Sequence, residues 1–343
     1  MPQIDAADLR RFAHDLLCAG GFTNADATQT AELLVWANLR GVDSHGVLRI
    51  PRYLEMIETG VMLSGGSIET VSARGAVCLL DGGKCPGAVG MNAAVARAAD
   101  LARAQGLGWC AVRRISHAGA VGYFTSALAR QGLVGLAMTA SKPLMNYHGA
   151  VGEALSTNPL SIAVPVPGAE PVVLDMSTAA VALGKIMAAR ENGRAIPRGW
   201  GVDAEGRETT DPATVTSLLP MAGAKGSGLS LMIELLTSVL AGNPVIGPVL
   251  EGTKKGGFNG MVLAIDPAAF GAPEVFLASV RLLVDQIHAL PPAPGTDAVL
   301  LPGERGAQTA AQRGAEGIPL AAGTAANLAA LAGRLGVAVP YAL

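Results

Sequence analysis

The feature that most constrains the fold is an uneven alternation of strand-like and helix-like segments. After residue 65, short runs rich in Val, Ile and Leu alternate with longer Ala-rich runs of helical periodicity. Neighbouring strand candidates, such as residues 160–167 and 171–178, are joined by connections of hairpin length, which suit antiparallel strands. The pattern predicts an α/β (α+β) protein with a mixed or mostly antiparallel sheet flanked by helices.

Both ends of the chain are expected to be helical. Residues 4–20 place Leu9, Phe12, Leu16 and Leu17 on one face, and a second helix begins at Asn24 and ends before residue 41. Residues 279–290 and 324–337 have the same periodicity, whereas residues 261–270 read as a strand. We therefore expect residues 1–70 to pack with residues 270–343 as a helical domain, and residues 71–269 to form the α/β domain.

Composition excludes several classes of protein. The chain has 343 residues, of which 50% are hydrophobic and 15% charged, so it can bury a large core. A net charge of −2 without a long basic patch argues against nucleic acid as a partner. The longest apolar stretch, residues 229–242, contains Glu234 and is too short to cross a membrane. The high mean hydropathy of +0.39 favours a subunit interface.

The N-terminus and the cysteines indicate the compartment. The first residues are partly charged and lack the apolar region of a signal peptide. The four cysteines form no CxxC pair and no Cys/His spacing typical of a metal site, so we expect no metal. Reduced thiols in a cytoplasmic protein are the simplest interpretation.

Motifs that are missing from the sequence narrow the chemistry further. No GxGxxG follows a strand, so a Rossmann dinucleotide site is not expected. The sequence also has no GxxxxGK[ST] phosphate loop, no GxSxG nucleophile elbow and no HExxH zinc motif.

The segment of residues 41–53, GVDSHGVLRIPRY, carries the residues best suited to chemistry. His45, Arg49 and Tyr53 follow one another at intervals of four and would share a face of a helix, although Pro51 disturbs that register. An arginine grips a carboxylate, and an imidazole exchanges a proton near neutral pH. The alternative is a helix start capped by Ser44 with a solvated arginine, and this pattern alone does not separate the two.

Two more histidines stand beside glycines, which allow a ligand to approach the backbone closely. These are His117 in ISHAGAVGY and His148 in NYHGAVG. Three histidines in such surroundings favour a functional role for at least one of them.

The stretch LRGVDSHGVLRIPRYLEMIETG, residues 39–60, resembles the malate/L-lactate dehydrogenase family of type 2. Further segments resemble the family in the same order along nearly the whole chain: residues 115–124, 156–165, 173–186, 196–212, 223–236 and 301–320. The resemblance implies a non-Rossmann fold whose α/β domain binds NAD or NADP, and a homodimer or dimer of dimers. It also implies hydride transfer between nicotinamide and a small 2-hydroxy or 2-oxo acid of the malate, lactate, ureidoglycolate or sulfolactate type.

The resemblance also assigns roles to single residues. His45 or His117 would be the catalytic acid/base, and Ser44, Arg49 and Tyr53 would line the pocket for a small carboxylate substrate. The positions that match the family's cofactor contacts are Ser141, Asp175, Met176, Ser177, Lys225, Glu304 and Arg305.

This chain departs from the family pattern around the same site. Ser116, Ser156 and Ser227 stand where the family often has Asn, Gly and an aromatic residue, and Tyr147 and His148 are also unusual. These departures leave the substrate open. One alternative is an NAD(P)H-dependent reductase of a cyclic imino acid such as piperideine- or pyrroline-2-carboxylate, and a second is an inactive relative that only binds a ligand.

Overall fold

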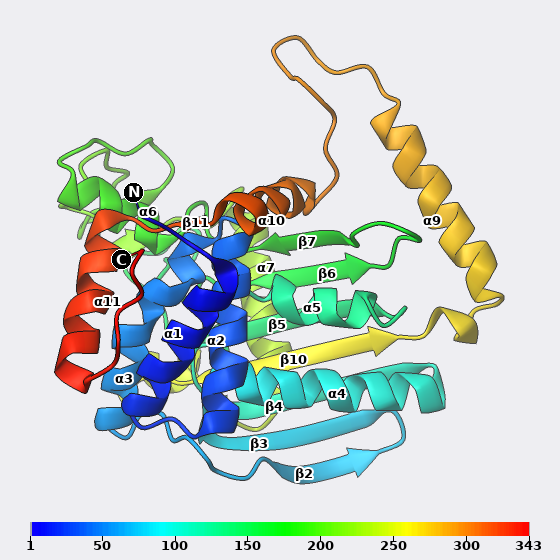
Figure 1. The fold of residues 1–343 in the computed structure, drawn as a ribbon, viewed down its shortest axis with the longest axis horizontal. Helices are drawn as coiled ribbons and strands as arrows, with labels where there is room; N and C mark the ends of the chain where they lie inside the picture. Colours follow the sequence, from blue (N-terminus) through cyan, green and yellow to red (C-terminus); the bar gives the residue numbers. More distant parts are fainter. Residues whose placement is uncertain (1, 343) are drawn as a thin grey trace.

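A seven-stranded mixed sheet forms the centre of the molecule, shown in Figure 1. The computed structural model describes residues 2–342. Within this sheet, β3 and β4 are parallel and the other neighbouring strands are antiparallel. The strands, in spatial order, are β2 (Glu69–Arg74), β3 (Val77–Cys85), β4 (Leu107–Ile115), β10 (Phe258–Ile265), β5 (Val134–Ser141), β6 (Leu160–Val164) and β7 (Val172–Met176). The predicted non-Rossmann, mostly antiparallel sheet is confirmed.

Helices cover the two faces of the sheet unequally. Helices α4 (Gly87–Gln105) and α5 (Gly122–Ala129) pack on one face in a large apolar cluster. Helix α7 (Ala224–Glu234) and the π-helical turn η3 (Leu235–Val239) pack on the other. Because side chains alternate along a strand, Val262 of β10 belongs to the first cluster and its neighbour Met261 to the second.

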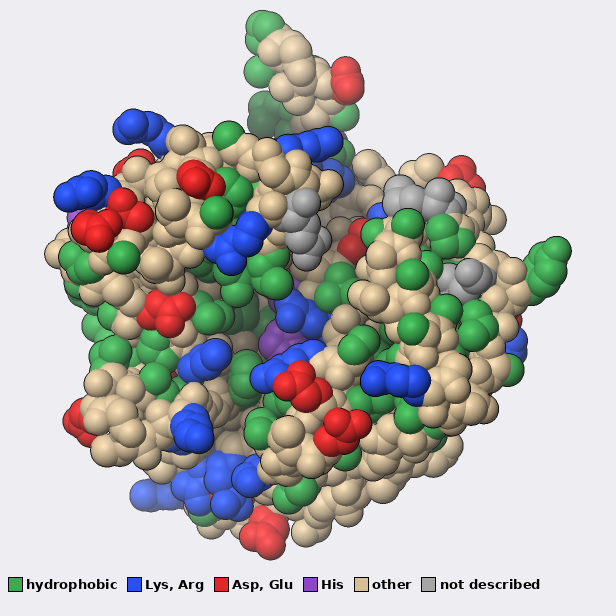
Figure 2. All heavy atoms as spheres, turned by 90° about the vertical axis from the view of Figure 1, so that its left-hand side faces the viewer, with side chains coloured by type: hydrophobic (Ala, Val, Ile, Leu, Met, Phe, Trp, Pro, Cys, Tyr) green, Lys and Arg blue, Asp and Glu red, His purple; other side chains and the backbone are tan. Residues whose placement is uncertain are grey.

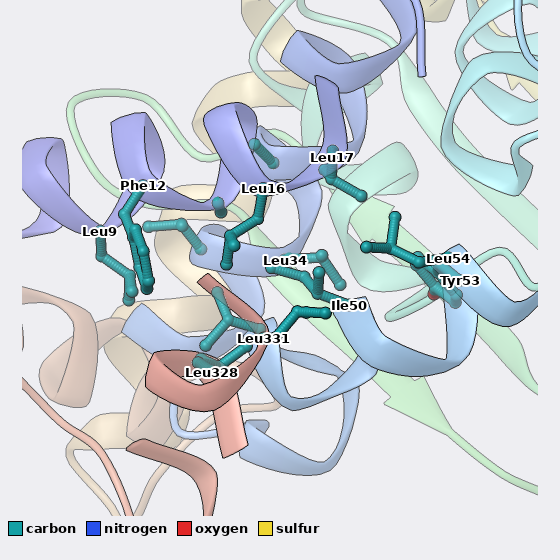
Figure 3. Packing of buried hydrophobic residues seen from close by; sticks show 14 of the residues in the cluster. Leu9, Phe12, Leu16, Leu17, Leu34, Ile50, Tyr53, Leu54, Leu328 and Leu331 are labelled. Carbon is teal, nitrogen blue, oxygen red and sulfur yellow. The ribbon is translucent and has the colours of Figure 1, made fainter. Parts of the chain in front are cut away.

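The N-terminal helices and the last helix share one core, shown in Figure 3. Leu328 and Leu331 of α11 (Ala322–Leu335) lie close to Leu34 of α2 (Asn24–Leu39) and Ile50 of α3 (Ile50–Glu58). Helix α1 (Ala6–Ala19) closes this bundle, and strand β1 (Gln3–Ile4) pairs with β11 (Ile318–Pro319) just before α11. The expected association of the two chain ends is thus built from α1, α2, α3 and α11, while the proposed domain boundaries remain a prediction.

Helix α9 (Pro273–His288) stands apart from the rest of the molecule as an arm in Figure 1. The chain returns through α10 (Glu304–Glu316), which packs against α2. The sequence did not predict α10, because it is rich in Gly, Ala and Gln and carries no apolar stripe.

Small elements complete the layer beside the bundle. They are α6 (Leu183–Glu191), β8 (Gly201–Val202), β9 (Ser217–Leu218) and α8 (Ile246–Leu250), around an apolar cluster that includes Met145 and Leu155. The strand expected over residues 261–270 is wrong at its end, because β10 stops at Ile265 and Asp266 starts the turn η4 (Pro267–Ala269) by accepting from the amide of Ala268. In residues 2–342 no helix is long and apolar enough to cross a membrane.

Candidate active site

The segment predicted as one helical face is instead three short pieces. Residues Asp43–His45 and Val47–Arg49 form single 3₁₀ turns, and α3 begins at Ile50 with Pro51 in its first turn, where proline is tolerated. No side chain caps any of these three pieces. The alternative in which Ser44 caps a helix is therefore wrong.

Ser44, His45 and Arg49 are tied to one another by local hydrogen bonds. The Ser44 hydroxyl lies 2.9 Å from Nδ1 of His45, and Nε of Arg49 donates to the Ser44 carbonyl over 2.7 Å. Both terminal nitrogens of the Arg49 guanidinium are left out of this bond. The arginine is therefore held in place and can still present donors to a carboxylate.

His117 lies beside this group although it is far away in sequence. It follows β4, and its Nδ1 is 2.7 Å from the phenol oxygen of Tyr53 on α3. Its ring stacks on His45 with centroids 5.6 Å apart, and the ring of Phe258 meets it edge-on at 5.9 Å. The structure thus brings both candidate acid/base residues into one cluster with Ser44, Arg49 and Tyr53.

The protein keeps both imidazoles neutral. Burial lowers the pKa of His45 to about 4, and the nearby Arg49 cation adds to the shift. Burial, together with His45 and Arg49, holds the pKa of His117 well below its usual range. Burial also raises the pKa of Tyr53, so its phenol stays protonated. The phenol and Nδ1 of neutral His117 share one hydrogen bond, in which the tautomer of the imidazole decides which of them donates.

Asp175 lies on β7 and faces the start of α5. Its Oδ2 accepts from the amide of Gly122 over 2.8 Å, and a side chain at position 122 would collide with the carboxylate. Part of the residue is exposed, and burial of its carboxyl raises the pKa to about 6 against the opposing effects of the Gly122 amide and the Arg40 cation. Its Oδ1 takes no part in the bond to Gly122 and can accept a hydrogen bond from a polar ligand.

A second polar group surrounds the start of α7. The hydroxyl of Ser141 is 2.6 Å from that of Ser156, and Ser230 of α7 donates to the Ser156 carbonyl. Just after Met176, the last residue of β7, and Ser177, the carbonyl of Thr178 accepts from the amide of Met221, three residues before α7. These bonds link Ser141, and the chain next to Met176 and Ser177, to α7 and the residues just before it, and Lys225 lies in the first turn of α7.

The departures from the family pattern have local structural roles. Ser116 is buried and accepts from the amide of Gly87, and Ser156 holds Ser141. The hydroxyl of Ser227 accepts from the amide of His148, which places the histidine ring next to Gly223. Ser156 and Ser227 thus make contacts at α7, whereas Ser116 binds the start of α4 beside His117, and the histidine pair is intact.

Two residues predicted to contact the cofactor, Glu304 and Arg305, lie on α10 away from the histidine pair. Glu304 pairs with His288 over 2.8 Å and accepts from the amide of Leu301, because it sits in the first turn of α10. Arg305, next to it, is exposed. In the described part of the chain neither is brought to the histidine pair.

Sequence reasoning missed Phe258, Asn38 and Arg313. Phe258 starts β10 opposite Ile115 and Ser141, which explains how it reaches His117, but nothing in the sequence reveals that register. Asn38 and Arg313 contact Asp43 next to the site, and Asp43 in the VDSHG stretch is the one signal that could have pointed to them.

Figure 2 shows a hollow on this face, with histidine and basic side chains inside it. A pocket of about 590 Å³ lies elsewhere, between α9, α10 and residues 166–172. Among residues 2–342, no cluster of three or more His, Cys, Asp or Glu side chains could hold a metal ion.

The sequence is similar to known proteins along nearly its whole length. The family described as malate/L-lactate dehydrogenase matches residues 4–329 of the chain. The chain belongs to this family. A ureidoglycolate dehydrogenase (NAD(+)) from Escherichia coli O157:H7 is 32% identical over 322 residues, 93% of this chain and 92% of that protein. A (2R)-3-sulfolactate dehydrogenase (NADP(+)) from Chromohalobacter salexigens is 35% identical over 299 residues, 84% of this chain and 88% of that protein.

Solved structures agree with the family assignment. The Δ1-piperideine-2-carboxylate reductase from Pseudomonas syringae pvar. tomato superposes with a TM-score of 0.85 at 30% identity, over 96% of this chain and 100% of that one. The predictions of an NAD(P)-dependent oxidoreductase and of its family are confirmed at this level.

Proposed function

We propose that this dehydrogenase transfers hydride between a nicotinamide dinucleotide and C2 of a small 2-hydroxy or 2-oxo acid. The observation that carries the proposal is the cluster of His45, His117, Tyr53 and Arg49, which combines proton exchange with a carboxylate grip at one place. The names of the relatives, which include ureidoglycolate and sulfolactate dehydrogenases, support the substrate class.

Arg49 binds the substrate carboxylate, and one of the two histidines exchanges the hydroxyl proton. Neutral imidazoles suit this task because a free nitrogen can take the proton of a 2-hydroxy acid. A bound carboxylate places a negative charge beside the pair and raises the imidazole pKa values back toward neutrality. The protein thus gains a stronger base when the substrate is present.

The residues around the start of α7 fit a dinucleotide. The exposed Lys225 offers a cation, Ser141 and Ser177 offer hydroxyls, and no side chain caps the helix. When bound, the dinucleotide would supply or accept the hydride, and these residues would hold its phosphates and sugars.

A panel of substrates tests the proposal. Malate, lactate, ureidoglycolate and sulfolactate, and their 2-oxo partners, are mixed with NAD(H) or NADP(H), and absorbance of the reduced nicotinamide is followed. We expect turnover with at least one acid that depends on His45 or His117. No turnover with any acid, together with unchanged nicotinamide fluorescence on titration, would overturn it.

Reduction of a cyclic imino acid is the second candidate function. It is favoured by the fold shared with the piperideine-2-carboxylate reductase, and Arg49 would grip the same carboxylate. Including piperideine- and pyrroline-2-carboxylate in the panel separates the two functions, since only one substrate class should turn over fast.

We also propose that the protein works as a homodimer. Helix α9 exposes Val275, Leu282 and Leu283, and the outer side of α7 and η3 exposes Met232, Leu235 and Val239. A lone helical arm is marginal in water unless its apolar face is covered, and a second copy of this chain carries matching apolar surface. Light scattering at micromolar concentration should give at least twice the mass of 34.6 kDa, and a monomer mass would contradict the proposal.

A further inference from the structure

An arginine from the C-terminal part of the chain holds the turn that carries His45. Nη1 of Arg313 on α10 donates to Oδ1 of Asp43 over 2.7 Å, and Nη2 donates to Oδ2 over 3.2 Å. Nη1 also donates to the carbonyl of Asn38 at the end of α2. Asp43 opens the turn whose next two residues are Ser44 and His45.

Asn38 holds the other side of the same turn. Its Nδ2 donates to Asp43 over 2.7 Å, and its Oδ1 accepts from the amide of Val47 over 2.8 Å. The side chain fits because residue 46 is glycine: a Cβ there would lie 2.1 Å from Oδ1 of Asn38. The turn from Asp43 to Val47 is therefore fixed at both ends by Asn38, and Arg313 locks the Asp43 end.

The pair of Arg313 and Asp43 has the geometry of a specific contact. Two parallel hydrogen bonds of a guanidinium fix both position and angle of the carboxylate, which a lysine cannot do. The side chains of Arg313 and Asp43 are 17% and 46% exposed, whereas those of the pair of Arg11 and Asp8 on α1 are 70% and 48% exposed, so the difference lies in the arginine. A pair with a largely buried arginine is screened less by solvent than such a surface pair.

We propose that Arg313 is a positioning residue that orients Ser44 and His45 through Asp43. Its contacts are with Asn38 and Asp43, and its catalytic consequence rests on the proposed function. Because Arg313 and Asp43 lie outside the apolar core of the helical bundle, their loss should misplace the turn without unfolding the protein. Small misplacements of a reacting group cost much rate, which makes turnover sensitive to this contact.

Variants separate positioning from stability. We expect Arg313→Met to lower kcat/KM for the best substrate of the panel about 10- to 100-fold, mostly through kcat. Binding of the reduced dinucleotide and the melting temperature should stay close to those of the wild type. Arg313→Lys should recover part of the loss, and Arg11→Met is the matched control that should change nothing. Adding Asp43→Asn to Arg313→Met should lower kcat/KM little further, because both substitutions remove the same contact between Arg313 and Asp43.

A readout without turnover tests the same idea. Diethylpyrocarbonate modifies neutral imidazoles, and peptide mass spectrometry gives the rate at each histidine. We expect faster modification of His45 and faster amide exchange over residues 41–53 in Arg313→Met, with His14 unchanged. Wild-type rates at His45, or wild-type kcat/KM in a folded Arg313→Met enzyme, would overturn the proposal.

If the wild type turns over no substrate, the proposed function fails, while the modification rates still decide the role of Arg313. If Arg313→Met does not fold, Asp43→Asn carries both readouts, with the same expected and contradicting results.

Discussion

The two walls of the candidate site are built in opposite ways. One wall, on the helical bundle and the end of β4, places His45, His117, Tyr53 and Arg49 next to a dense apolar core that includes Ile50. The other, around the start of α7, consists of small hydroxyls, backbone groups and the exposed Lys225.

The difference separates two tasks, proton transfer on the first wall and binding of an anionic ligand on the second. Low polarity around the first wall lowers imidazole pKa values and keeps a phenol protonated, which prepares proton transfer. The second wall offers the exposed cation of Lys225 and a helix start that no side chain caps, which suits an anionic ligand. We therefore expect substitutions on the first wall to change the rate of chemistry and those on the second to change binding.

The largest effects should come from the histidine pair. We expect His45→Ala and His117→Ala to differ: one lowers kcat by about 10²- to 10⁴-fold, because it removes the acid/base, and the other mainly raises KM for the acid. Steady-state kinetics of both variants with saturating dinucleotide identify which histidine does which. Wild-type kcat in both would show that the first wall does not carry the chemistry.

Arg49→Met should have the next largest effect. Loss of a charge-assisted grip on the carboxylate should lower kcat/KM about 100-fold, mainly through KM, while binding of the dinucleotide is unchanged. Arg52→Met is the matched control, since Arg52 on the same helix is exposed and pairs only with Glu55. Equal losses in both variants would remove the special role of Arg49.

Lys225→Met should have a smaller effect, on the second wall only. Loss of one cation facing phosphate should weaken dinucleotide binding about 10-fold, measured by nicotinamide fluorescence. At saturating dinucleotide, kcat should stay near the wild-type value. A fall in kcat without weaker binding would contradict the division between the walls.

A change of pH near neutrality should have the smallest effect on kcat/KM. In the free enzyme the pKa of His45 is lowered to about 4 and that of His117 is also lowered, so both are neutral at pH 7. For oxidation of a hydroxy acid, kcat/KM should stay flat as pH falls from 8 to about 5 and drop only as the pH approaches 4, where the imidazoles protonate. A decline that starts at the ordinary histidine pKa of about 6.5 would show that burial does not act as inferred.

Much of this arrangement could be predicted from local patterns. Alternating apolar runs with short connections predicted the sheet, and the helical periodicity of Leu9, Phe12 and Leu16 predicted the first helix of the bundle. Ser44, His45, Arg49 and Tyr53 could be proposed together because they lie within ten residues of one another.

The rest depends on contacts between distant segments. His117 reaches His45 only because β4 ends at the bundle, and Phe258 joins it through the register of β10. Helix α10, which carries Arg313, has no apolar stripe that could predict it, and its docking depends on polar contacts with Asn38 and Asp43. Local periodicity contains no information on such pairings.

Transfer of a labelled hydride tests the central claim most directly. The enzyme is given reduced dinucleotide with deuterium at both positions of nicotinamide C4 and the best 2-oxo acid of the panel, and the product is analysed by mass spectrometry and NMR. We predict one deuterium at C2 of the hydroxy acid in the wild type, with its rate of appearance reduced in His45→Ala or His117→Ala. A reduced product without deuterium at C2, or transfer at the wild-type rate in both variants, would contradict the account.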